Sequence, residues 1–77
     1  MLLVRVGGMG AQAIRVVVVE DDPDVAELVR TVLVRRLGCD VRVLGSAFGF
    51  DELMREFSPN VLVTDAITAR WLLAHRD

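Results

Sequence analysis

The chain has 77 residues, of which 53% are hydrophobic and 26% charged, so it is globular in composition and long enough for one small domain at most. Its single cysteine, Cys39, excludes an intrachain disulfide and a four-thiolate zinc site, and it favours a cytoplasmic protein. A formal net charge of −2 without a basic cluster argues against direct nucleic-acid binding. No apolar run reaches the roughly 18 residues of a membrane-spanning helix, so no membrane partner is expected.

Residues 1–13, MLLVRVGGMGAQA, come before the first strong structural pattern. We expect them to form a flexible leader and the domain to occupy residues 14–77. The alternative is that the Gly-rich segment is a turn joining LLVRV to IRVVVV as an antiparallel hairpin. These glycines precede a strand instead of following one, so they do not predict a dinucleotide-binding loop.

Residues 14–25, IRVVVVEDDPDV, predict a buried strand followed by a helix. Residues 14–19 are apolar on both faces apart from Arg15, as in a central parallel strand covered by helices. Asp22 is the expected helix N-cap, with Pro23 at the first helical position. Gly38 is the expected end of the helix. The apolar stripe expected to face the core consists of Val25, Leu28, Val29, Val32, Leu33 and Leu37.

The alternation of strand and helix continues beyond this helix. Residues 39–43 alternate apolar and polar residues, as in a half-exposed edge strand, and Cys39 is expected to be a buried apolar residue. Residues 50–57 predict a second helix, which ends at the sequence Ser-Pro-Asn. Residues 61–64 predict a third, buried strand that leads into Asp65.

The final stretch, ITARWLLAHRD, predicts a short third helix. Thr68 is its expected cap, and we expect Trp71 and Leu72 to pack inward as hydrophobic anchors. His75 is expected to be a solvated residue and not a ligand.

Strands that alternate with helices predict an α/β fold with a parallel sheet and right-handed crossovers. Numbered along the chain, the three strands are expected in the order 2-1-3, a partial doubly wound sheet with two to three helices. Strands 14–19 and 61–64 would then end side by side, about 5 Å apart. Glu20, Asp21 and Asp65 would share one pocket, where open α/β sheets bind ligands.

Three carboxylates in one pocket raise one another's pKa unless a cation is present. Mg²⁺ suits such a pocket, because it binds one or two carboxylates and keeps positions for water and phosphate oxygens. We therefore interpret Glu20, Asp21 and Asp65 as metal ligands and Asp65 as a nucleophile that can carry a phosphoryl group as an acyl phosphate. The competing interpretation of the Glu-Asp-Asp run is helix capping by acids, which needs no metal.

These residues resemble a known family. An acid pair after the first strand, Pro23 at the start of the first helix, and Asp65 placed 44 positions after Asp21 are similar to the receiver domain of bacterial two-component response regulators. The resemblance covers about residues 14–65 and implies a flavodoxin-like, receiver-like fold. It also implies that Asp65 is the phosphoacceptor, that Glu20 and Asp21 help to hold Mg²⁺, and that the partner is a sensor histidine kinase in a phosphorelay. A receiver of this kind is a phosphoacceptor domain and not an enzyme.

The chain also departs from the receiver pattern. It contains no Lys, so the ammonium group that pairs with phosphate in receivers is missing, and Ile67 and Ala69 replace the Met-like residue and the Pro of the loop after the phosphoacceptor. With only the N-terminal portion of a receiver expected, we predict phosphotransfer impaired by truncation. Two alternatives stay open: a protein-interaction module that is not phosphorylated, or an inactive fragment of a disrupted response-regulator gene. An open sheet edge would also permit self-association.

Overall fold

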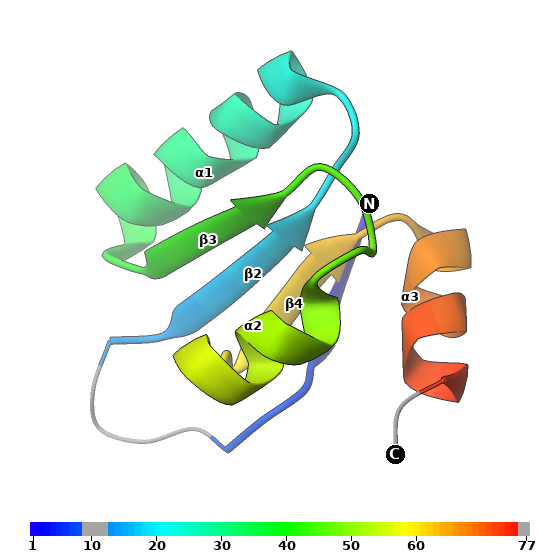
Figure 1. Cartoon of the computed structure of the whole chain (residues 1–77). Helices are drawn as coiled ribbons and strands as arrows, with labels where there is room; N and C mark the ends of the chain where they lie inside the picture. Colours follow the sequence, from blue (N-terminus) through cyan, green and yellow to red (C-terminus); the bar gives the residue numbers. More distant parts are fainter. Residues whose placement is uncertain (9–12, 76–77) are drawn as a thin grey trace.

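The computed structural model describes residues 1–8 and 13–75, and Figure 1 shows how their elements are arranged. Within these residues the strands are β1 (Leu2–Arg5), β2 (Arg15–Val19), β3 (Asp40–Leu44) and β4 (Val61–Thr64). The helices within them are α1 (Pro23–Leu37), α2 (Phe50–Phe57) and α3 (Ala66–Ala74). The predicted α/β class and the alternation of strand and helix from residue 14 onward are confirmed.

The described strands form one mixed sheet in the order β1-β4-β2-β3. β2 runs parallel to both of its neighbours, with Val18 opposite Val43 of β3 and opposite Val63 of β4. This parallel part has the predicted order 2-1-3. The prediction of a three-stranded, wholly parallel sheet is nevertheless wrong, because β1 adds a fourth strand antiparallel to β4.

The expectation that residues 1–13 form only a leader is wrong, because β1 lies within them. Its register places Leu3 opposite Val63 and Val4 opposite Leu62. The hairpin alternative is also wrong, since β1 pairs with β4 and not with β2. Residues 9–12 of the expected leader lie outside the described residues.

The chain leaves β1 in close contact with the segment before β4. The N–H of Val6 donates to the carbonyl oxygen of Asn60 at 2.8 Å, which continues the antiparallel pairing by one residue. A Cβ built on Gly7 would lie 2.6 Å from the carbonyl oxygen of Pro59. Position 7 therefore requires glycine for this close approach of two backbones.

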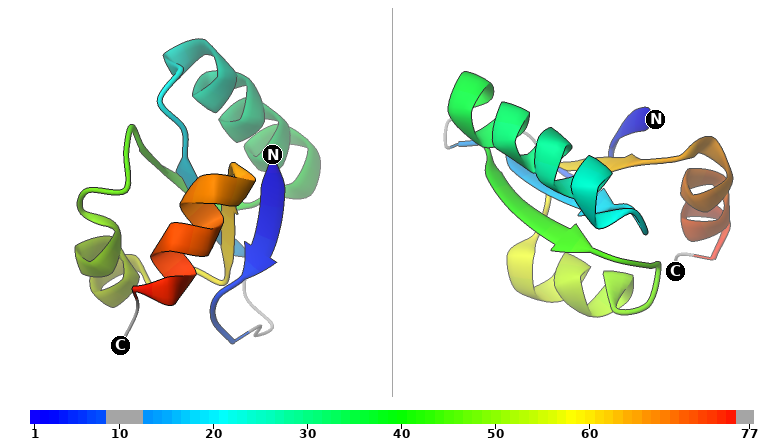
Figure 2. Two further views of the ribbon diagram at one scale, coloured as in Figure 1. Left: turned by 90° about the vertical axis from the view of Figure 1, so that its right-hand side faces the viewer. Right: turned by 90° about the horizontal axis from the view of Figure 1, so that it is seen from above.

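Helices cover both faces of the sheet, as Figure 2 shows, with α1 on one face and α2 and α3 on the other. The alternation of side chains along each strand divides the core into two clusters. The buried residues on the α1 face are Val16, Val18, Cys39, Val61 and Val63. The buried residues on the opposite face are Val17, Val19, Phe50, Leu62 and Leu72. Burial of Cys39 as an apolar residue is confirmed.

Both predicted ends of α1 are confirmed. Asp22 is the N-cap, with Oδ1 accepting from the N–H of Asp24 at 2.9 Å, and Pro23 is the first helical residue. Gly38 ends the helix with φ at 66°, a left-handed conformation that glycine adopts without the strain of a Cβ.

The apolar stripe of α1 is only partly buried, which corrects the prediction. Val29 and Leu33 pack against the sheet, whereas Leu28 is 66% exposed and Leu37 is 68% exposed. Two further residues of the expected stripe, Val25 and Val32, are also exposed. The reason is the placement of the helix: α1 packs over β2 and β3, and among the described elements no second helix lies beside it on that face.

The last helix differs from the prediction at its start and in its packing. Asp65, and not Thr68, is the N-cap of α3. Leu72 is buried as predicted, but Trp71 is 52% exposed, so its predicted inward packing is wrong. The indole of Trp71 instead stacks on the ring of His75, with 4.4 Å between ring centroids, and His75 is exposed.

Candidate functional site

The carboxyl ends of the parallel neighbours β2 and β4 bring three acidic residues to one pocket. Glu20 and Asp21 follow β2, and Asp65 follows β4. All three line a pocket of about 260 Å³, together with Ser46 and Thr68. The structure therefore places the three residues selected from the sequence at one site, at the sheet rim where open α/β folds bind ligands. Their roles as metal ligands and phosphoacceptor stay predictions.

Hydrogen bonds join the strand ends from which the residues of this pocket follow. Thr64, which is fully buried, donates its hydroxyl to the carbonyl oxygen of Val19 at 2.9 Å. The N–H of Glu20 donates to the carbonyl oxygen of Leu44 at 3.0 Å. These two contacts join the ends of β4, β2 and β3, so the residues that follow each strand start from fixed positions.

Of the three acidic residues that follow β2, one caps α1 and the other two line the pocket. Asp22 caps α1, whereas Oε1 of Glu20 accepts from the N–H of Asp22 at 3.1 Å. Asp21 is exposed and lines the pocket. Helix capping, the competing interpretation of the run, therefore accounts for Asp22 and leaves the placement of Asp21 to be explained.

Asp65 is held by the first turn of α3. Its Oδ1 accepts from the N–H of Thr68 at 2.7 Å, and its Oδ2 accepts from the hydroxyl of Thr68 at 2.8 Å. The N–H of Thr68, and after it the hydroxyl, hold the pKa of Asp65 below its usual value. The exposed carboxylate is thus ionised at neutral pH, and its two oxygens have fixed directions.

The donor chemistry of the pocket suits a hard cation, because all three acidic side chains offer carboxylate oxygens. Among residues 1–8 and 13–75, however, no three His, Cys, Asp or Glu side chains lie close enough together to hold a metal ion. The hydrogen bonds explain this spacing, since Glu20 and Asp65 are each bound to the start of the helix that follows them. Each carboxylate oxygen keeps a lone pair. One or two of these carboxylates with water would satisfy Mg²⁺.

Two hydroxyl residues of the pocket were not identified from the sequence as site residues. Thr68 is the helix cap expected from the sequence. An N-cap side chain commonly accepts from the N–H three residues later, and Thr68 lies three residues after Asp65, so this spacing instead indicates Asp65 as the cap. Ser46 follows β3, which is parallel to β2 and therefore ends at the same rim. The rule that placed Asp65 at this rim also predicts the position of Ser46.

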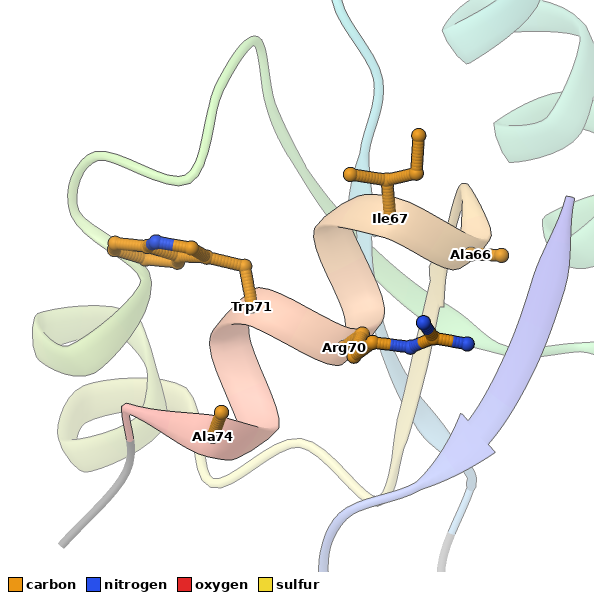
Figure 3. Close-up of a pocket in the computed structure, with 5 residues that line it drawn as sticks. All are labelled: Ala66, Ile67, Arg70, Trp71 and Ala74. Atoms are coloured by element: carbon orange, nitrogen blue, oxygen red, sulfur yellow. The ribbon is translucent and has the colours of Figure 1, made fainter.

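A second cavity of the described residues lies elsewhere and has different chemistry. It measures about 400 Å³ and is lined by residues of α3 alone, Ala66, Ile67, Arg70, Trp71 and Ala74. Figure 3 shows Trp71 directed toward the segment between β3 and α2, and Arg70 directed toward β1. No carboxylate lines this cavity, so its greater size does not make it a better candidate for phosphoryl chemistry than the acidic pocket.

Comparison with protein-family models, with curated proteins and with solved structures gives no match for this chain. None of the helices in residues 1–8 and 13–75 has the length and apolar character needed to cross a membrane.

Proposed function

We propose that this chain is a receiver-like phosphoacceptor domain of a cytoplasmic phosphorelay, in which Asp65 accepts a phosphoryl group with the help of Mg²⁺. The observation that supports the proposal is the convergence of Glu20, Asp21 and Asp65 on one pocket at the ends of two adjacent parallel strands. The order β3-β2-β4, with α1 on one face and α2 and α3 on the other, is also compatible with the first half of a flavodoxin-like sheet.

The proposed reaction is an exchange of one bond to phosphorus for another. An oxygen of the Asp65 carboxylate forms the new O–P bond, and the bond from phosphorus to the donor group breaks, with its electron pair leaving on the donor. With a histidine kinase as donor, the leaving atom is an imidazole nitrogen; with acetyl phosphate, it is a carboxylate oxygen. Bound Mg²⁺ would neutralise the charge on the transferred phosphoryl oxygens.

The chain's own residues would position the groups that react. One or two of the carboxylates of Glu20, Asp21 and Asp65, with water, would hold the ion. The Thr68 N–H and hydroxyl orient the Asp65 carboxylate before reaction and lower its pKa. Ser46 lines the same pocket, and its hydroxyl is a hydrogen-bond donor for phosphoryl oxygens. Because the chain has no Lys, no lysine ammonium group pairs with the phosphoryl oxygens, and we expect the reaction to be slow.

Acetyl phosphate with Mg²⁺, followed by intact-mass analysis of the full chain, tests this proposal. We expect a phosphoryl adduct that depends on the ion and is missing in Asp65→Asn, which removes the nucleophile and preserves a capping side chain. The matched control is Asp51→Asn, which changes an exposed Asp in the first turn of α2 and should not alter labelling. Equal adducts in wild type and Asp65→Asn would show that Asp65 is not the acceptor.

One observation favours the second candidate, an interaction module without phosphotransfer. Both oxygens of Asp65 are engaged by Thr68, so a structural role alone could account for this carboxylate. On that candidate, wild type would acquire no adduct under any concentration of Mg²⁺, and Asp65→Asn would fold normally. The labelling experiment therefore separates the two functions.

A further inference from the structure

We propose that two copies of this chain associate through the outer edges of their β1 strands, as an antiparallel pair related by a twofold axis perpendicular to the sheet. β1 is an end strand of the sheet, and on its outer side no strand of the described residues pairs with it. An end strand offers a row of N–H and C=O groups that another strand can bind.

The backbone groups that face outward follow from the pairing with β4. Val6 donates to Asn60, the residue opposite it when the register of β1 and β4 is extended by one position. In an antiparallel ladder, alternate residues direct their N–H and C=O groups to opposite sides. Val4 therefore bonds toward β4, whereas Leu3 and Arg5 direct their backbone groups to the open edge.

The two end strands of the sheet differ in how they are protected. On β3, Arg42 forms an ion pair with Asp40 at 2.9 Å and covers the ring of Phe57. Charged side chains of this kind discourage pairing with another strand. On β1, no charged side chain precedes Arg5, while Met1 is 62% exposed and Leu3 is 66% exposed. β1 is therefore the edge available for association.

Symmetry fixes the register of the proposed pair. Leu3 lies opposite Val63, so its side chain is on the α1 face of the sheet. A twofold axis perpendicular to the sheet continues each face into the same face of the second copy. Leu3 of one copy can then lie opposite Leu3 of the other, with Met1 opposite Arg5, and every residue in these pairs directs its backbone groups to the open edge.

The proposed pairing stops at two copies and does not build a filament. Pairing of β1 with β1 uses both unprotected edges, and the protected β3 strands remain at the two ends.

Sedimentation equilibrium of the full chain over a wide concentration range tests the proposal. We expect the mass to rise to twice that of one chain and to stay there. Leu3→Lys places two ammonium groups opposite each other and should raise the dimer dissociation constant by roughly tenfold or more. Leu28→Lys is the matched control, because Leu28 is also 66% exposed and lies on α1, and it should leave the constant unchanged. Thermal unfolding of both variants checks that the fold is intact.

A cross-link tests the register. Opposed residues of a hydrogen-bonded antiparallel pair have Cα atoms about 5.5 Å apart, which is within disulfide range. We expect Leu3→Cys to form a covalent dimer on mild oxidation and Leu28→Cys not to, with Cys39 buried in both. A chain that stays monomeric, a dimer indifferent to Leu3→Lys, a mass that grows without limit, or a dimer that Leu3→Cys does not cross-link would each overturn the proposal.

Discussion

At the scale of single residues, Asn60 contributes more to the fold than its sequence position suggested. Its Oδ1 accepts from the N–H of Arg15 at 2.7 Å, and its amide donates to the carbonyl oxygen of Gly8. Only 4% of Asn60 is exposed. It thus connects the start of β2 to the segment after β1, whereas its sequence context indicated only the end of a helix.

We expect Asn60→Ala to lower the free energy of unfolding by about 1–3 kcal/mol, because the part-buried N–H of Arg15 loses its acceptor. Urea unfolding measures the change. Thr64→Val is the comparison, since it removes only the hydroxyl bond to Val19 and should cost about 1 kcal/mol. If Asn60→Ala were the milder of the two substitutions, the connecting role of Asn60 would be wrong.

Asp65 predicts a pH dependence of stability at the same scale. Thr68 lowers the pKa of Asp65 in the folded chain. A carboxyl of this kind stabilises the fold above its unfolded pKa, and the contribution is lost as pH falls through the folded value. We expect wild type to be more stable than Asp65→Asn at neutral pH and the difference to shrink below about pH 4. Urea unfolding at a series of pH values measures it, and a difference independent of pH would contradict the assignment.

At the scale of elements, two adjacent glycines provide a test of how β1 docks against β4. A Cβ on Gly7 would lie 2.6 Å from a backbone oxygen of Pro59, whereas a Cβ on Gly8 meets nothing within 4 Å. Gly7→Ala should therefore separate the end of β1 from β4 and cost about 1–3 kcal/mol, as overpacking does. Gly8→Ala should be neutral or slightly stabilising. Equal unfolding midpoints in urea would show that the close approach is unimportant.

The elements that local chemistry determines were predictable from the sequence. The cap Asp22, the stop Gly38 and the strand through Val16 to Val19 each follow from side chains within a few residues. β1 was not predictable in this way, because its partner β4 lies far along the chain and the short segment LLVRV carries no turn signal toward it. The exposure of Leu28 was missed for a related reason: helical spacing identifies an apolar face but not whether another element covers it.

The candidate site shows the same division. The rule that parallel strands end at one rim was enough to bring Glu20, Asp21 and Asp65 to a single pocket. The directions of their carboxylates were not predictable, because each depends on which N–H groups the following helix presents. Thr68 illustrates this point: it occupies both oxygens of Asp65 only because α3 begins at Ala66 and not two residues later.

At the scale of the whole molecule, pairing with β1 makes β4 an interior strand of the sheet and not an end strand. All four residues of β4 are buried, and β4 lies between β1 and β2. Without β1, one side of β4 would expose its backbone groups, and Leu62 would lose its neighbour Val4. A domain of this size has a total stability of only about 4–12 kcal/mol. Loss of one strand therefore removes a large share of it.

We accordingly expect a variant lacking residues 1–6 to lose cooperative unfolding in urea and to aggregate through the newly exposed edge of β4. Far-UV circular dichroism and light scattering measure the two effects. The control is full-length Leu3→Lys, which keeps the pairing of β1 with β4 but weakens the proposed association of two copies. If the shortened variant and the control unfolded at the same urea midpoint, β1 would matter for assembly alone. If only the shortened variant lost cooperative unfolding, β1 would stabilise the fold of the single chain through its pairing with β4.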